Sequence, residues 1–156
     1  MMGNNAAMKI WYWSLVILLM VIITVLSNTP DLVFFGKSLP PEVRVWIAKH
    51  SIKWGTTGFF SYSISPHPDY ILHKLGHIFF FGLLGSMLYW AMNRSVPKAV
   101  MVVTLFALID EIHQGFTLGR SSRLGDVVLD VVAAVGFILF FASRRAKQMI
   151  KEHIIQ

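Results

Sequence analysis

Residues 105–126 read LFALIDEIHQGFTLGRSSRLGD, and this stretch decides how the chain is expected to fold. It begins inside an apolar run, gathers charged side chains and passes through a short loop that contains glycine and serine. It then reaches Asp126 at the start of another apolar run. Two helices joined by a short loop lie antiparallel to each other. The stretch therefore predicts a helical hairpin whose polar residues lie near the loop.

Apolar runs recur along the 156 residues, of which 55% are hydrophobic, against a usual share of about 45–50%. A helix needs about 20 mainly apolar residues to cross a bilayer core. Two runs are long enough without any charge, and two more are long enough with their charged ends. Buried helices of a soluble protein are the alternative for the last two, but the first two leave little chain for a soluble core. The sequence predicts an all-α integral membrane protein, a single domain over residues 1–156 with four transmembrane helices at about 10–27, 73–92, 97–116 and 124–143.

The one long connection spans residues 28–72. Within it, residues 40–54 (PPEVRVWIAKHSIKW) place most of their apolar side chains at helical spacing, with basic residues elsewhere. Such a segment is typical of a helix lying in the membrane interface. We therefore expect an interfacial amphipathic helix in this first extracytoplasmic loop, with a packed cap over the bundle as the equal alternative. The chain has no cysteine, which excludes disulfides and cysteine chemistry.

Basic residues set the expected orientation. If the N-terminus is cytoplasmic, each side of the membrane carries seven lysines or arginines. Three on the outer side, Lys74, Arg120 and Arg123, belong to a polar cluster, and without them the cytoplasmic side leads by seven to four. Since positive residues favour the cytoplasmic side, both termini are predicted there. The net charge of +6 then belongs to helix flanks near membrane lipids, and no nucleic-acid partner is expected.

The polar cluster follows from the expected topology. In an antiparallel bundle, the start of the second helix, the end of the third and the start of the fourth lie on one membrane side. Asp110 lies about 18 Å along its helix from Lys98, and a charge deep in the bilayer costs roughly 2.5–3.5 kcal/mol unless protein or water surrounds it. We therefore predict a charged pocket at this end of the bundle. Its candidate residues are Lys74, His77, Asp110, Glu111, His113, Gln114, Arg120, Arg123, Asp126 and Asp130.

Four short motifs occur here in order, namely HKLGH at 73–77, DEIHQ at 110–114, LGR at 118–120 and GDVVLD at 125–130. Through them, residues 73–136 resemble the VanZ-like family of bacterial membrane proteins. The resemblance implies a multi-pass protein of the bacterial cytoplasmic membrane that is associated with resistance to glycopeptide antibiotics, especially teicoplanin. The sequence departs from the family's pattern at three positions, where His73 stands for Asp, Leu118 for Pro and Asp130 for Asn.

Three functions fit the cluster. In the first, an enzyme acts on a lipid-linked or cell-wall substrate, with Glu111 or His77 as general acid or base and with Asp110 and Asp126 orienting the reacting groups. In the second, the protein only binds an anionic lipid head group or a lipid-linked cell-wall precursor. In the third, the polar groups have only a structural role and hold the helices together through salt bridges and hydrogen bonds.

The first two functions need positive groups for an anionic substrate. Arg120, with Lys74 or Arg123, is expected to hold a phosphate or carboxylate, as a guanidinium fork does well. The remaining substrate-side candidates are His113, Gln114 and Asp130.

A metal site is a further alternative. His73 and His77 are four apart, as zinc ligands on a helix are, and His113 and carboxylates are expected nearby. The glutamate of the zinc motif is missing from that helix, so no metal is assigned, and the sequence does not identify a cofactor. Glycines are expected to permit close helix contacts at positions 76, 82, 85, 125 and 136.

Overall fold

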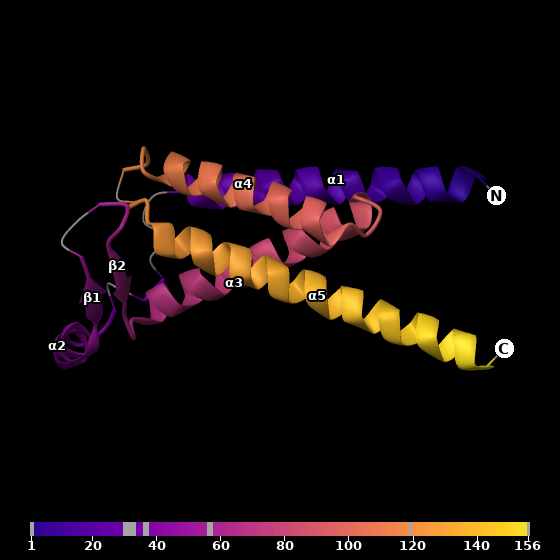
Figure 1. Cartoon of the computed structure of the whole chain (residues 1–156). Coiled ribbons are helices and arrows are strands. Elements are labelled where there is room, and N and C mark those ends of the chain that lie inside the picture. The colour runs from indigo at the N-terminus through magenta and orange to yellow at the C-terminus, as the bar shows by residue number, and fades with distance from the viewer. Residues whose placement is uncertain (1, 30–33, 36–37, 56–57, 119, 156) are drawn as a thin grey trace.

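The computed structural model describes residues 2–29, 34–35, 38–55, 58–118 and 120–155. Within these residues the chain forms five helices and one two-stranded antiparallel ribbon (Figure 1). The elements are α1 Met2–Ser27, α2 Pro41–His50, β1 Ile52–Trp54, β2 Tyr62–Ile64, α3 Pro68–Ala91, α4 Val96–Gln114 and α5 Leu124–Ile155.

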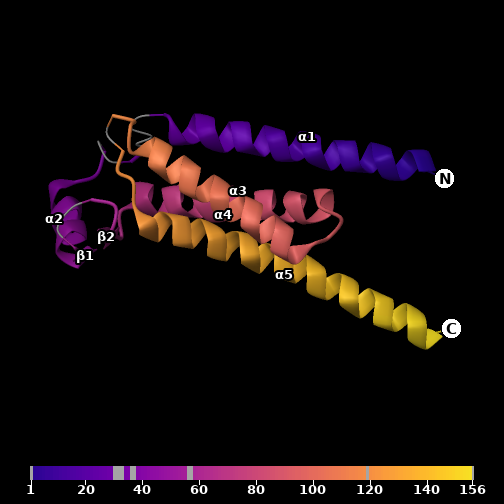
Figure 2. The same ribbon diagram turned by 45° about the horizontal axis from the view of Figure 1, so that its top comes forward.

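Four long helices form the bundle. α1, α3, α4 and α5 run alongside one another, whereas α2 and the ribbon form a small group at one end (Figures 1 and 2). Both termini lie at the opposite end in both views. α3 is central, because it packs against α5 most extensively and also against α1 and α4.

The start of α3 is set by local sequence. Pro68 lies in its first turn, where the missing N–H would have had no partner within the helix. His67 precedes it in extended conformation, and its Nδ1 accepts the N–H of Asp69 at 3.1 Å. These two residues fix the position along the chain from which Lys74 and His77 project.

Three helices in the described part of the chain are long and apolar enough to cross a membrane, namely Ala6–Ser27, Pro68–Ala91 and Leu124–Ile154. The predicted bundle of four transmembrane helices is therefore not confirmed. α4 is not among the three, since its 19 residues include Lys98, Asp110 and Glu111. It nevertheless packs within the bundle, against α5 and α3.

Two helices extend beyond the predicted transmembrane spans. α1 begins at Met2, before the span predicted at about 10–27, and α5 continues to Ile155, past the span predicted at about 124–143. Residues 40–54 are not one helix, because Ser51 adopts an extended conformation with φ −83° and ψ 130°. The β-branched Ile52 begins a strand in which it pairs with Ile64. The fold is therefore helical apart from this small ribbon.

The contact between α3 and α5 depends on glycines of α3. A Cβ on Gly82 would lie 2.8 Å from the ring of Phe137, and one on Gly85 would lie 2.9 Å from the Cβ of Ala134. A Cβ on Gly125 would overlap the ring of Tyr62. The prediction of close helix contact is confirmed at Gly82 and Gly85, whereas Gly125 lies against Tyr62 of β2 and not against a helix. The prediction is wrong at positions 76 and 136, where an added Cβ would meet none of the described atoms within 4 Å.

The contrast between these glycines gives a stability test. We expect Gly85→Ala to lower the apparent melting temperature in detergent, because the new methyl would also lie 3.1 Å from the Ala134 backbone. Gly136→Ala should raise it, since alanine is favoured over glycine in a helix by about 1 kcal/mol and the site is open. Circular dichroism on the purified variants measures both. A rise in both variants would show that the helices can separate slightly without loss.

Candidate functional site

The predicted site residues lie at the loop end of the bundle, but they divide into separate groups of contacts. The first group joins α1 to α4. Ser27 Oγ donates to Asp110 Oδ2 at 2.7 Å, and Gln114 Nε2 donates to the same oxygen at 3.0 Å. All three residues are buried. Asp110 and Gln114 therefore face α1 and not the cationic residues of α3.

His113 lies beside this group on the exposed side of α4. Its Nδ1 is 3.4 Å from Nδ2 of Asn28, at the end of α1. Thr117 donates to Oδ1 of the same asparagine at 3.2 Å. These contacts tie the end of α4 to the end of α1 and bring no other predicted site residue to His113.

The second group joins α3 to α5. Lys74 forms an ion pair with Asp126, and His77 Nδ1 lies 2.9 Å from Asp130 Oδ1. The Lys74 ammonium also lies over the rings of Tyr62 and Tyr70, at 5.6 and 5.2 Å from their centroids. Asp126 and Asp130 are four residues apart, so they lie on the same face of α5. Two turns of α3 thereby hold two turns of α5.

The third group centres on the loop between α4 and α5. Glu111 Oε1 accepts the backbone N–H of Arg123 at 2.5 Å, and Arg123 Nη1 donates to Ser63 Oγ of the ribbon at 2.6 Å. The backbone N–H of Leu124 donates to the Phe59 carbonyl at 2.8 Å. The start of α5 is thus anchored both to α4 and to the ribbon segment.

Arg120 caps the C-terminal end of α1. Its Nη2 donates to the carbonyls of Leu26 at 3.0 Å and Thr29 at 3.2 Å. Carbonyls at a helix C-terminus have no partners within the helix, so a cation there is favourable. Its Nη1 lies 3.3 Å from Nε2 of His73 on α3. Arg120 therefore bridges the ends of α1 and α3.

Burial makes these partnerships energetically important. Asp110, Glu111, Asp126 and Asp130 are each at most 6% exposed. An ionised carboxylate without partners would cost several kcal/mol at such a site. Each of the four has at least one donor or cation beside it, although Asp110 Oδ1 and Glu111 Oε2 are buried with no hydrogen-bond partner among the described residues.

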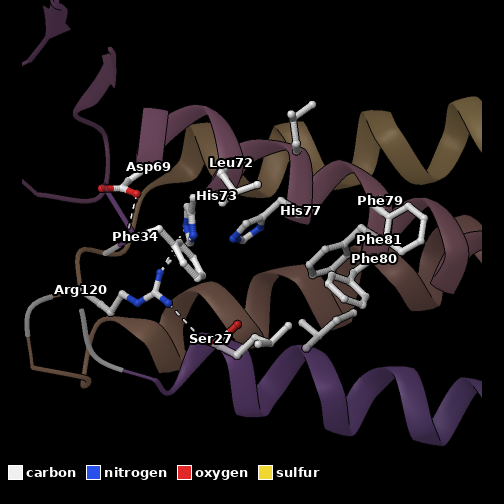
Figure 3. A pocket seen from close by; sticks show the side chains of 14 residues that line it. Ser27, Phe34, Asp69, Leu72, His73, His77, Phe79, Phe80, Phe81 and Arg120 are labelled. Atoms are coloured by element: carbon white, nitrogen blue, oxygen red, sulfur yellow. Dashed lines mark hydrogen bonds between the residues drawn. The ribbon is translucent and has the colours of Figure 1, made fainter. Parts of the chain in front are cut away.

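A cavity of about 470 Å³ lies between α1 and α3. Figure 3 shows its side chains, with the phenylalanines of α3 at one end and with Arg120, His73 and His77 toward the other. The lining is mostly apolar. It comprises Ile23, Leu26, Ser27, Phe34, Asp69, Leu72, His73, Leu75, Gly76, His77, Phe79, Phe80, Phe81 and Arg120.

Only His77 and Arg120 of the predicted site residues line this cavity. Lys74, Asp126 and Glu111 lie outside its lining, with partners from the protein. His73 and Ser27 line it, but the sequence did not place either among the site residues. Ser27 ends an uncharged run, so nothing in the pattern marked it. His73 was set aside because it departs from the family's pattern.

His77 has the geometry of an oriented acid or base. Its Nδ1 contacts the buried Asp130 carboxylate at 2.9 Å. A carboxylate on one ring nitrogen fixes the orientation of the imidazole and stabilises its protonated form, which leaves the other nitrogen to exchange a proton. The ring lies at the cavity between α1 and α3 (Figure 3).

The metal alternative gains no support. The described residues include no group of three or more histidine, aspartate or glutamate side chains placed to hold a metal ion. The rings of His73 and His77 lie 4.6 Å apart, edge to face, and His113 contacts Asn28 instead.

The ion pair between α3 and α5 can be tested by a double-mutant cycle. We expect Lys74→Met to destabilise the protein by about 3 kcal/mol, because it leaves the Asp126 carboxylate buried without its cation. The double variant Lys74→Met/Asp126→Leu should lose less than Lys74→Met alone. Unfolding in one detergent measures all variants. Strictly additive losses would show that the two side chains do not interact.

Comparison with known proteins identifies the family of the chain. The family model for VanZ/LLP1 matches residues 11–146. No curated protein and no solved structure matches the chain. The matched region extends from α1 into α5, so it contains every contact described above. With its long apolar helices, the chain is a membrane protein, and it belongs to the VanZ/LLP1 family.

Proposed function

We propose that this protein binds an anionic lipid of the cell envelope, with the lipid tail in the cavity between α1 and α3. The observation that carries the proposal is the composition of this cavity, which is apolar along most of its length and cationic at one end. An anionic lipid likewise has an apolar tail and a charged head group. The site would take a lipid-linked cell-wall precursor or another anionic lipid of the same chemistry.

The apolar part of the cavity suits an acyl or isoprenoid chain. Phe79, Phe80 and Phe81 lie along it, with Ile23 of α1 opposite. Ligand pockets of a few hundred Å³ lined mainly by apolar and aromatic groups are typical binding sites.

The polar end suits a phosphate. Arg120 is anchored by the carbonyls of Leu26 and Thr29, which holds its guanidinium at the cavity, and His73 lies beside it. A fixed guanidinium fork binds phosphate with little loss of conformational freedom. Asp69 also lines this end, and its Oδ1 accepts the N–H groups of Phe34 and Phe35 at 2.9 Å.

We place the site at the outer face of the bacterial cytoplasmic membrane. Both termini lie at the end of the bundle opposite α2 and the ribbon, and we assign that end to the cytoplasm from the distribution of basic residues (Figure 1). α4 then crosses as the fourth span, with its charged end against protein. Membership of the family supports a role in resistance to glycopeptides such as teicoplanin.

A purely structural role, in which polar contacts hold the helices together, accounts for part of the cluster. Contacts with a neighbouring helix, which hold helices together, are made by Lys74, Asp110, Gln114 and Asp126. It does not account for a cationic end on a cavity of about 470 Å³. We therefore assign the buried pairs to stability and the cavity to ligand binding.

A glycine pair gives the test of binding. Gly76 lines the cavity and has room for a side chain, so Gly76→Phe should fill the space and lower the number of copurified lipids by the one bound in this cavity. Gly136 has the same room but lies outside the cavity lining, so Gly136→Phe should retain lipid. Native mass spectrometry and lipid extraction of both proteins measure bound lipid. Equal retention by the two variants would remove the proposal.

A second function is favoured by one observation, the contact between His77 and Asp130 at the edge of the cavity. We propose that this pair supplies acid–base chemistry on the bound head group, with His77 exchanging the proton and Asp130 orienting it. Glu111, the other candidate base, accepts the Arg123 N–H and lies outside the cavity lining, which favours His77 over it.

The variant His77→Gln distinguishes lipid binding from acid–base chemistry. If the pair is catalytic, a sensitive host that expresses the wild type should gain teicoplanin resistance and His77→Gln should lose it while still retaining lipid. His113→Gln is the matched control, because His113 is outside the cavity lining. Membrane levels of the variants are matched before susceptibility is measured. Full protection by His77→Gln would leave binding alone as the function, and no protection by the wild type would contradict the glycopeptide role.

A further inference from the structure

A second cavity lies at the end of the bundle that carries the termini. It has a volume of about 410 Å³ and is formed by the end of α3, the turn after it and the last third of α5. Its lining is Tyr89, Trp90, Arg94, Phe141, Arg144, Arg145, Gln148, Met149 and Glu152. None of these residues belongs to the site described above.

The lining carries three arginines and one carboxylate, Glu152. Within the described part of the chain, no ion pair involves Arg94, Arg144 or Arg145. Nη1 of Arg145 is buried and has no hydrogen-bond partner among the described residues. A buried donor of this kind costs free energy unless a ligand or water accepts from it.

Two features hold the arginines around the cavity. Arg94 follows the end of α3 with φ 64°, and its N–H donates to the Tyr89 carbonyl at 2.7 Å. The Arg144 guanidinium lies 4.7 Å from the centroid of the Phe140 ring. Arg145 comes from the next position of α5. The positive groups therefore come from two sides of the cavity, the turn and the helix.

Aromatic side chains border the cavity at the end of the α3 span. Trp90 lies at the last turn of the α3 span, with its ring 4.8 Å from that of Phe141 and 5.6 Å from that of Tyr12. Tryptophan and tyrosine are enriched where the hydrocarbon meets the head groups. The cavity thus has aromatic residues toward the bilayer and arginines toward water.

We propose that this cavity binds the phosphate of an anionic phospholipid from the leaflet at the termini. The arginines would donate charge-assisted hydrogen bonds to the phosphate oxygens, and basic cavities between transmembrane helices bind such head groups. Glu152 would accept a hydrogen bond from a head-group hydroxyl, as phosphatidylglycerol provides. This site is separate from the cavity between α1 and α3, and its failure would leave the proposed function untouched.

The experiment compares bound phosphatidylglycerol and phosphatidylcholine by native mass spectrometry of the full chain. All variants carry Gly76→Phe, so that the cavity between α1 and α3 does not contribute. Arg94→Gln/Arg145→Gln should reduce phosphatidylglycerol binding by about tenfold or more, because it removes two charge-assisted hydrogen bonds. Lys147→Gln/Lys151→Gln removes the same charge from exposed positions of α5 outside the lining and should leave binding unchanged.

Three results would overturn the proposal. Equal losses in the two double variants would assign the effect to net charge, and equal binding of phosphatidylcholine would remove selectivity for an anionic head group. Displacement of the lipid by inorganic phosphate at millimolar concentration would assign the cavity to free phosphate instead. Equal melting temperatures of the two double variants exclude unfolding as the cause of a difference.

Discussion

Four acidic side chains lie almost wholly buried in a bundle of apolar helices, and the arrangement of the chain depends on giving each of them a partner. Asp110 receives hydrogen bonds from α1 and from its own helix, Asp126 and Asp130 receive a cation and an imidazole from α3, and Glu111 receives a backbone N–H from the loop. Because an unpartnered buried carboxylate costs several kcal/mol, these contacts determine which helices are neighbours at this end and in what register.

The central position of α3 lets one helix contribute both to stability and to the proposed binding site. Toward α5 it presents Gly82 and Gly85, and the backbones approach closely there. Its histidines, in the first half, and the phenylalanines at 79–81, just before Gly82, line the cavity beside α1. The tight contact fixes α3 firmly against α5, which leaves the less tightly packed α1 side to accommodate a ligand. His77 belongs to both faces, because its Nδ1 contacts Asp130 of α5 and its ring lines the cavity.

The sequence was sufficient to predict the long helices and the gathering of polar residues at one end, since apolar runs and short loops determine both. It was not sufficient to predict which polar residues touch. Asp110 and Glu111 are adjacent in sequence, but successive helical positions differ by about 100°, so one contacts α1 and the other contacts the loop before α5. The importance of Ser27 and the α1–α3 cavity depends on how helices distant in sequence pack, and no local pattern encodes that. The strand at Ile52 was missed because a three-residue ribbon has too few residues to show a period.

Arg120 contributes to two structures at once, since its guanidinium holds the last carbonyls of α1 and also lines the cavity beside that helix. The donors of one guanidinium are limited to five, so a phosphate that takes up some of them draws on the same set that anchors α1. Occupancy of the cavity and docking of α1 are then thermodynamically linked, and the linkage is reciprocal. Whatever loosens the end of α1, including thickness changes in the surrounding bilayer, would alter affinity for the ligand, and the ligand would in turn alter how the helix responds to the membrane.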